Sequence, residues 1–445
     1  MTTPQTAAAI GGHNGHNGSD GHNGSDGSDG RNGRGVLRQL IAAQFFGCLA
    51  DNALLFVAIA MLLDRHAADW MTPALRLFFY ASYVLLAPFA GALADSVPKG
   101  RLIVWTNLVK LAGCALLLLN LHPLLAYAVI GIGAAAHGPA RYGILPEVLP
   151  TERLVAANAW LETVTVAASL LGVALGSWLA GADQAMPSGV PDAPHPTGAL
   201  QLLATLYGLA TVCTVGLRAL GKSNPAALAH PRALTSAFLR SLKALAGDPD
   251  GAMSLAVTSL FWAVAAVLQF IVLRWATVAL QMSLAQAALL QGVVALGMIA
   301  GALIAARRIA LGQAVRLLPA GLLIGALLMA LPAVTSLWLA ISLLLAIGML
   351  AGMLLIPMNA LMQHRGDVLM ATGQSIAVQH FSECLASLVM LGIYGVLLTA
   401  QVPLSAIVLG LGVLVIGAML TIILRRHVSG TRLPHSAQPA PQPRR

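Results

Sequence analysis

The chain is dominated by apolar segments that follow one another with only short polar interruptions. A helix needs about 20 consecutive apolar residues to cross the hydrocarbon core of a bilayer. The sequence therefore predicts an all-α polytopic membrane protein with twelve transmembrane helices. We expect them near residues 36–62, 74–95, 101–120, 124–145, 154–181, 197–220, 251–280, 284–306, 313–331, 335–358, 371–399 and 403–424.

Composition and charge agree with this class of protein. Hydrophobic residues make up 58% of the chain and charged residues only 9%, whereas soluble domains carry about 25% charged residues. The net charge of +9 does not indicate a nucleic-acid partner, because the Lys and Arg residues lie mostly in short loops between apolar segments. The loops on one side are strongly basic, so we expect that side, and both termini, to be cytoplasmic. The four cysteines lie inside apolar segments without a CxxC pair, which predicts neither a disulfide framework nor a zinc site.

The longest basic loop divides the spans six and six. We expect a disordered polar tail over 1–35, an amino-terminal six-helix half over 36–220, a cytoplasmic inter-half loop over 221–250, a carboxy-terminal half over 251–424, and a cytoplasmic tail over 425–445. A weak repeat supports the division: GALAD at 91–95 closes the second span and GALIA at 301–305 closes the eighth. Two six-helix halves around a midplane site describe the major facilitator fold.

Ionisable residues inside the apolar segments are the candidate binding residues, because charges are expensive there and usually face a cavity or a partner. Asp51, with Asn52 beside it, lies near the middle of the first span. Lys110 lies at mid-depth in the third span, where a cavity-facing or paired cation competes with a side chain that snorkels to the interface. Arg141 lies near one end of the fourth span between two prolines, so headgroup anchoring and substrate contact both remain open.

Glu162 and Glu383 add two buried acids, and Arg274 adds a third buried base. Three acids and three bases inside the spans suggest mutual pairing. For both glutamates a structural ion pair and a proton relay remain alternatives.

Residues 91–101, GALADSVPKGR, resemble the signature loop between the second and third helices of the major facilitator superfamily. In that loop small residues allow close helix approach, and the acid and following bases form a cytoplasmic latch. The resemblance gives Asp95, Lys99 and Arg101 gating roles. The alternative is an ordinary basic loop with an acid at a helix end.

The chain contains none of the motifs that mark ATP-driven pumps or hydrolases: no GxxxxGK[ST], no GxSxG and no HExxH. We therefore expect no enzyme activity and no cofactor, and energy from a gradient of ion or substrate. His13, His16 and His22 could ligate a metal, but a solvated low-complexity tail is the favoured interpretation.

Several blocks carry a more specific resemblance. They are QFFGCLADNALLF, YVLLAPFAGALADSVPKGR, TNLVKLAG, GIGAAAHGPARYGILPE, SLFW, IPMNALMQHRG and SIAVQHFSECLASLVMLGIY. These blocks look like the lysophospholipid transporter family of Gram-negative bacteria, and the match runs from about Gly35 to His427. The polar tail lies outside it.

The resemblance implies a major facilitator protein of the bacterial inner membrane that moves lysophospholipids, chiefly lysophosphatidylethanolamine, from the outer to the inner leaflet. A partner acyltransferase/acyl-carrier-protein synthetase would reacylate them there. Asp51 matches the family's acid in the first helix, and Arg141 stands where the family commonly has a lysine; Lys110, Glu162 and Glu383 carry over as candidates. The family's seventh-helix arginine, however, is Gln269 here, and Arg274 lies about 140° further around the helix.

The runner-up function is a proton-coupled exporter of amphipathic drugs or metabolites, which the buried acids alone would permit. An intramembrane acyltransferase is a third class, but the sequence shows no positioned nucleophile and base for it.

Overall fold

The computed structural model describes residues 26–67, 71–180, 196–221, 224, 231–282 and 284–430, and the described segments that have regular structure are helical. The helices are α1 (Asp26–Asp64), α2 (Met71–Ser96), α3 (Lys99–Leu118), α4 (Pro123–Gly143), α5 (Leu145–Val148), α6 (Thr151–Leu179), α7 (Pro196–Val215), α8 (Pro231–Gly247), α9 (Pro249–Ala279), α10 (Leu284–Arg308), α11 (Leu318–Ala330), α12 (Leu337–Leu369), α13 (Thr372–Thr399) and α14 (Leu404–Gly430). Two short 3₁₀ helices, η2 (Leu311–Leu317) and η3 (Leu331–Ala333), flank α11.

The described residues include twelve helical segments long and apolar enough to cross a membrane, as the sequence predicts. The largest difference is in the tenth span, which continues to Leu369 although we expected it to end near 358. Pro357 does not break this helix, and the extra turns carry polar residues that find partners in neighbouring helices. The span count and helical class are therefore confirmed, and one boundary is wrong.

The start of α1 also differs from the expectation. The helix begins at Asp26, so disorder over residues 26–35 is wrong. Extending a helix costs far less than nucleating one, and the long apolar segment behind these residues supplies the nucleus. Residues 1–25 lie outside the described part of the chain, as do residues 431–445 of the expected carboxy-terminal tail.

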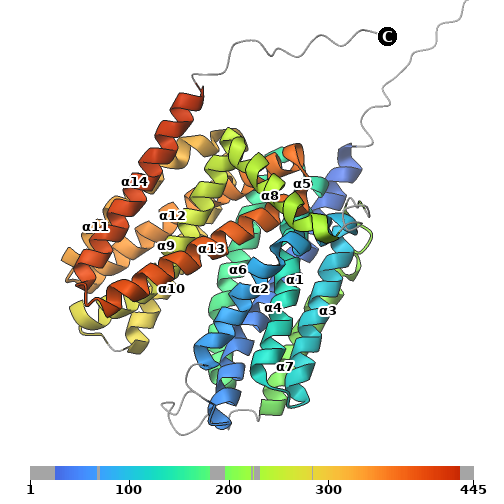
Figure 1. Ribbon diagram of the computed structural model, residues 1–445, viewed down its shortest axis with the longest axis horizontal. Coiled ribbons are helices and arrows are strands. Elements are labelled where there is room, and N and C mark those ends of the chain that lie inside the picture. The colour runs from blue at the N-terminus through green and yellow to red at the C-terminus, as the bar shows by residue number, and fades with distance from the viewer. Residues whose placement is uncertain are drawn as a thin grey trace, which may run out of the picture.

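Figure 1 shows the helices in two bundles, one in blue to green (α1 to α7) and one in yellow to red (α9 to α14). Helices from different bundles touch along α2 and α13, along α4 and α13, and where α6 meets α10 and α12. These contacts define an interface between the halves. The functional side chains described below lie beside it.

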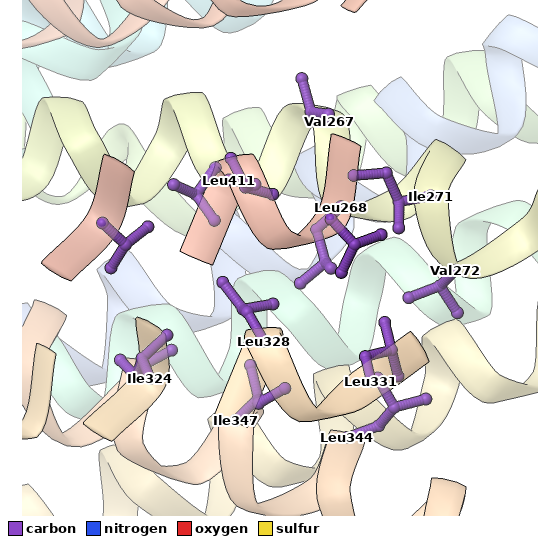
Figure 2. Close-up of a cluster of buried hydrophobic side chains, with 14 of the residues drawn as sticks. Val267, Leu268, Ile271, Val272, Ile324, Leu328, Leu331, Leu344, Ile347 and Leu411 are labelled. Atoms are coloured by element: carbon purple, nitrogen blue, oxygen red, sulfur yellow. The ribbon is translucent and has the colours of Figure 1, made fainter. Parts of the chain in front are cut away.

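Close packing inside the carboxy-terminal half depends on glycines at the α10–α12 contact. A Cβ added to Gly301 would lie 2.0 Å from the carbonyl oxygen of Met349, so only glycine permits this approach. Deeper in this half, apolar side chains of α9, α11, α12 and α14 converge on one another (Figure 2). Large apolar side chains such as Leu85 and Trp338 are exposed on the outside, where a bilayer would cover them.

The expected inter-half loop contains a helix that we did not predict. α8 is amphipathic: Leu234, Phe238 and Leu245 are buried, and the helix packs on α2, α9 and α13. The Ser241 hydroxyl donates a hydrogen bond of 2.5 Å to the Gln374 side chain of α13. The linker is therefore attached to the bundle at the end where α2 finishes and α13 begins, which we call the closed end.

Candidate functional site

A cavity of about 300 Å³ lies in the amino-terminal half, and we call it the polar pocket. Its walls come from α1, α2, α3, α4 and α6, and one side chain, His380, comes from α13 of the other half. Four of the predicted site residues line it: Asp51, Asn52, Lys110 and Arg141.

The centre of the polar pocket is an ion pair between α1 and α3. The Lys110 Nζ donates to Asp51 Oδ2 at 2.6 Å, and the Tyr207 hydroxyl of α7 donates to Asp51 Oδ1 at 2.7 Å. Lys110 and Tyr207 are buried, whereas the Asp51 side chain keeps 22% of its surface accessible. Two charged groups taken from water need such partners, because an unpaired ion in this setting is strongly unfavourable. The sequence predicted mutual pairing among the buried charges without identifying Lys110 as the partner of Asp51, and it gave no indication of Tyr207.

Asn52 makes hydrogen bonds within the wall of the polar pocket and does not pair with a charged group. Its amide donates to the Cys48 carbonyl at 2.9 Å and to the Ser169 hydroxyl of α6 at 3.2 Å. The bond to Ser169 joins α1 to α6, and Asn52 lines the polar pocket. The residue is therefore better described as a support of the site.

Arg141 supplies the pocket with a cation that has no carboxylate partner among the described residues. Its guanidinium lies over the ring of Tyr142, 4.2 Å from the ring centre, and its Nε is buried without a hydrogen-bond partner in that part of the chain. An arginine presents five donors in a planar fork that suits phosphate and carboxylate oxygens. This arrangement can accept an anion.

The two predicted buried glutamates lie next to the pocket, on opposite sides of the interface between the halves. The Tyr142 hydroxyl donates to Glu162 Oε2 at 3.4 Å. Across the interface, Glu383 accepts a hydrogen bond of 2.8 Å from Gln379 Nε2 and lies 3.3 Å from His380 Nδ1. Both carboxyl groups are buried, and neither lines the polar pocket.

A second cavity, of about 410 Å³, occupies the carboxy-terminal half; we call it the apolar cavity. Side chains of α9, α10, α11, α12 and α14 line it, together with one face of α6. Among them are Leu268, Ile324 and Ile347, which Figure 2 shows pointing into the same region. Thr165 of α6 borders both cavities. The two spaces therefore share a wall but differ in chemistry.

The expectation that Arg274 is a buried base is wrong, because its side chain is exposed; it lines neither cavity. It lies close to the carboxyl end of α9, where a long cationic side chain can reach the interface. Gln269, which replaces the arginine that the resemblance implies, lines the apolar cavity. The Gln269 carbonyl accepts a hydrogen bond of 2.9 Å from Gln291. The seventh transmembrane helix thus contributes no cation to either space.

The predicted gating residues Asp95 and Lys99 lie at the closed end and reach the other half. The Asp95 carboxylate accepts hydrogen bonds of 2.8 and 2.9 Å from the backbone N–H groups of Gly373 and Gln374, the first turn of α13. The first turn of a helix is positively polarised and has unpaired donors, so a carboxylate stabilises it. A Cβ at Gly373 would lie 2.6 Å from Asp95 Oδ1, so glycine is needed for this approach.

Lys99 extends the same network. Its ammonium lies 3.4 Å from Asp95 Oδ1 and 2.6 Å from Glu147 Oε1, and the Thr372 hydroxyl donates to Glu147 at 3.1 Å. All these charges are buried. Arg101, by contrast, is exposed and is absent from the network as described. The network of Asp95, Lys99, Glu147, Thr372 and Gly373 is the latch in the text below.

A second link between the halves lies deeper and was not predicted. Asn158 of α6 and Gln363 of α12 exchange two amide hydrogen bonds, of 2.8 and 2.7 Å. Both side chains are fully buried. A reciprocal amide pair satisfies both groups only while the helices stay together, so it favours the arrangement in which this end is closed.

The described residues contain no group of three or more His, Cys, Asp or Glu side chains that could hold a metal ion. The tail histidines His13, His16 and His22 lie outside the described residues.

Comparisons with known proteins agree with this architecture. Residues 40–389 match the Major Facilitator Superfamily. Solved structures with the same fold include the human organic anion transporter MFSD10, with a TM-score of 0.69 and 16% identity over 88% of this chain and 99% of that one. A bacterial homologue of the iron transporter ferroportin in its outward-facing state has a TM-score of 0.67 and 14% identity over 89% of this chain and 100% of that one. At such identities the likeness shows the fold alone.

Sequence relatives are much closer. Proteins named lysophospholipid transporter LplT from Yersinia pestis (strain Pestoides F) and from Yersinia pseudotuberculosis serotype O:3 (strain YPIII) are 39% identical to this chain over 369 residues. The match covers 83% of this chain and 88% of each relative. The chain therefore belongs to the major facilitator superfamily and, within it, to the lysophospholipid transporter family LplT.

Proposed function

We propose that this protein moves lysophospholipids, chiefly lysophosphatidylethanolamine, from the outer to the inner leaflet of a bacterial inner membrane. The observation that carries the proposal is the pairing of two cavities of opposite chemistry across one shared wall. The polar pocket holds Asp51, Lys110 and Arg141. The apolar cavity is lined mainly by apolar side chains, with Glu162 on its α6 wall. A lipid with one acyl chain and a charged headgroup is likewise divided into an apolar part and a charged part.

The chemistry of each part supports an assignment of the substrate. The Nε of Arg141 has no hydrogen-bond partner among the described residues, and the guanidinium suits the phosphate. The partly accessible Asp51 carboxylate suits an ammonium, which would compete with Lys110. The acyl chain would occupy the apolar cavity beside Thr165.

The direction of transport rests on the orientation in the membrane. The closed end carries exposed Arg101 and Lys243 and half-buried Arg365, and basic residues gather on the cytoplasmic side. We therefore assign the closed end and both termini to the cytoplasm. In this arrangement the latch blocks the cytoplasmic side, so breaking the latch would release the headgroup toward the inner leaflet. There the partner acyltransferase/acyl-carrier-protein synthetase would reacylate the lipid.

A proton-coupled exporter of amphipathic compounds is the second candidate, and the buried glutamates Glu162 and Glu383 favour it. The two functions differ in energy source. Collapse of the proton gradient would stop such an exporter, whereas facilitated lipid movement would continue.

The test uses vesicles that contain the purified protein, with the acyltransferase enclosed at the inner leaflet. Labelled lysophosphatidylethanolamine added outside is expected to appear as phosphatidylethanolamine, with or without a proton gradient. Vesicles with Leu296→Ala, a change at a side chain on the outer surface of α10, serve as the matched control. No product above that of protein-free vesicles would overturn the proposal, and dependence on the gradient would favour the exporter.

A further inference from the structure

His380 is the one described side chain from the carboxy-terminal half that lines the polar pocket. Its Nδ1 lies 3.3 Å from Glu383 Oε2, and the other oxygen of that carboxylate accepts a hydrogen bond from Gln379. A carboxylate accepts hydrogen bonds and does not donate them, so His380 Nδ1 carries a hydrogen. In the neutral ring Nε2 then presents a lone pair and acts as an acceptor.

This Nε2 has no hydrogen-bond partner within the described part of the chain, although it is buried. The rings of Tyr83 and Tyr142 flank the imidazole, each with its centre 6.0 Å away, and hold it in place. Gly138 of α4 faces Nε2: a Cβ there would lie 2.7 Å from it. A buried acceptor that is oriented, unsatisfied and placed beside a glycine indicates that something other than the protein completes it.

The side chains around His380 indicate which substrate group would bind to Nε2. Arg141, one turn along α4 from Gly138, lies over the same Tyr142 ring that flanks His380. An anion held by Arg141 would therefore place the atoms next to it beside His380. In a lysophospholipid the glycerol carbon next to the phosphoester-bearing carbon carries a free hydroxyl. That hydroxyl is a donor, and the corresponding ester of a diacyl phospholipid is not.

We propose that His380, oriented by Glu383, accepts a hydrogen bond from the free glycerol hydroxyl and so determines the specificity for a single-chain lipid. The inference rests on the proposed function and deepens it. A site built around a hydrogen bond to a hydroxyl rejects an analogue without that hydroxyl, because its own buried group stays unpaired. The bond also joins the substrate to the carboxy-terminal half, while Arg141 joins it to the amino-terminal half.

The alternative role of His380 is packing of α13 against α4, and substrate chemistry separates the two roles. The probes are lysophosphatidylethanolamine and its 2-deoxy analogue, which has a hydrogen in place of the hydroxyl. In reconstituted vesicles we expect the wild-type protein to transport the deoxy compound about tenfold less efficiently, the value of one neutral hydrogen bond. Equal transport of the two lipids by the wild-type protein would overturn the inference without affecting the proposed function. Failure to transport either lipid would instead contradict the proposed function.

Two variants locate the effect. His380→Phe keeps a ring but removes the acceptor. Gly138→Ala would bring a methyl carbon to 2.7 Å from Nε2, so the imidazole must move from its position. We expect each variant to transport both lipids at similar rates, so that the discrimination disappears. Val389→Phe, at an exposed position of the same helix, is the control and keeps the wild-type ratio. If both pocket variants discriminated as strongly as the wild type, His380 would not be the group that reads the hydroxyl. The ratio of the two transport rates is measured on one protein sample. A smaller amount of folded protein would lower both rates equally and leave this ratio unchanged.

Discussion

The Lys110 ammonium lies 2.6 Å from the Asp51 carboxylate, and the buried Tyr207 hydroxyl holds the other oxygen of that carboxylate. This relationship joins α1, α3 and α7, and it leaves one side of Asp51 open to the polar pocket. The pair therefore has two roles: it stabilises the amino-terminal half, and it offers a carboxylate to a cationic headgroup.

The two roles respond differently to substitution. Asp51→Asn leaves Lys110 without a charged partner, so we expect a lower thermal midpoint and a loss of transport of at least about tenfold. Adding Lys110→Met removes the stranded charge and is expected to restore much of the thermal midpoint, but not transport. Thermal unfolding in detergent and vesicle transport measure the two effects. Recovery of transport in the double variant would mean that Asp51 acts only as a structural partner.

The latch is expected to control access at the closed end. Asp95→Ala removes the carboxylate that caps α13, so the halves should separate there more often. A single cysteine at Ala377, which is buried in this arrangement, reports the change. In a background without other cysteines, we expect its labelling by a charged maleimide to become about tenfold faster.

Arg101→Ala is the matched control for the latch, because Arg101 is exposed and takes no part in the described network. Its labelling rate is expected to equal that of the parent protein. Equal rates for Asp95→Ala and the parent would show that the latch does not hold this end closed.

The apolar cavity is expected to set the tolerated acyl-chain length. Ala295 of α10 lines the cavity, and Ala295→Phe would fill part of it. We expect a several-fold loss of transport for long-chain lysolipids and little loss for short-chain ones, since overpacking excludes only the distal methylenes. The neighbouring Leu296→Phe, on the outer surface, should leave the chain-length profile unchanged. A uniform loss for all chain lengths would place the chain elsewhere.

The Asp248–Arg365 pair predicts a pH dependence of stability. Asp248 caps α9 just outside the membrane-spanning segment, and hydrogen bonds from the Arg365 side chain lower the pKa of its carboxyl from the ordinary value. A lowered pKa in the folded state means stabilisation that is present above the ordinary aspartate value of about 3.9 and is lost as the pH falls through the folded value.

We therefore expect the thermal midpoint to be flat between about pH 7 and 5 and to fall below about pH 4. Asp248→Asn should lose about 1 to 2 kcal/mol at pH 7, through a weaker cap and the missing charge. The variant should also show a smaller decrease on acidification. Equal acid sensitivity of the variant and the parent would assign the effect to other carboxyl groups.

Much of the fold could be predicted from the sequence, because segment length and charge placement determine which parts enter the bilayer. Residues Asp51, Lys110 and Arg141 could be selected because a charge inside an apolar segment is unusual. Their partners could not be selected. Tyr207 is 156 residues from Asp51, and Gln363 is 205 residues from Asn158. A single sequence carries no signal for such long-range contacts.

Three other differences between the expectation and the structure had different causes. α8 has the apolar residues Leu234, Phe238 and Leu245 near helical spacing, a pattern that indicates an amphipathic helix within the expected loop. Nothing in the sequence around His380 marks it out, and only the close approach of Gly138 and the contact with Glu383 distinguish it. The expectation for Arg274 had another cause. Its position in an apolar segment suggested burial, but a side chain near a helix end can extend to the interface.

The central claim is that one lipid occupies both cavities, with its headgroup in the amino-terminal half and its chain in the carboxy-terminal half. Photocrosslinking with two lysophosphatidylethanolamine probes, one reactive at the end of the chain and one at the headgroup, tests this claim directly. We predict that the chain probe labels α9, α10 and α12 around Leu268, Met298 and Ile347, and that the headgroup probe labels α1 and α4 around Asp51 and Arg141. An excess of unlabelled lysolipid should remove both signals. Labelling of the same helices by both probes, or labelling confined to the outer surface, would contradict the account.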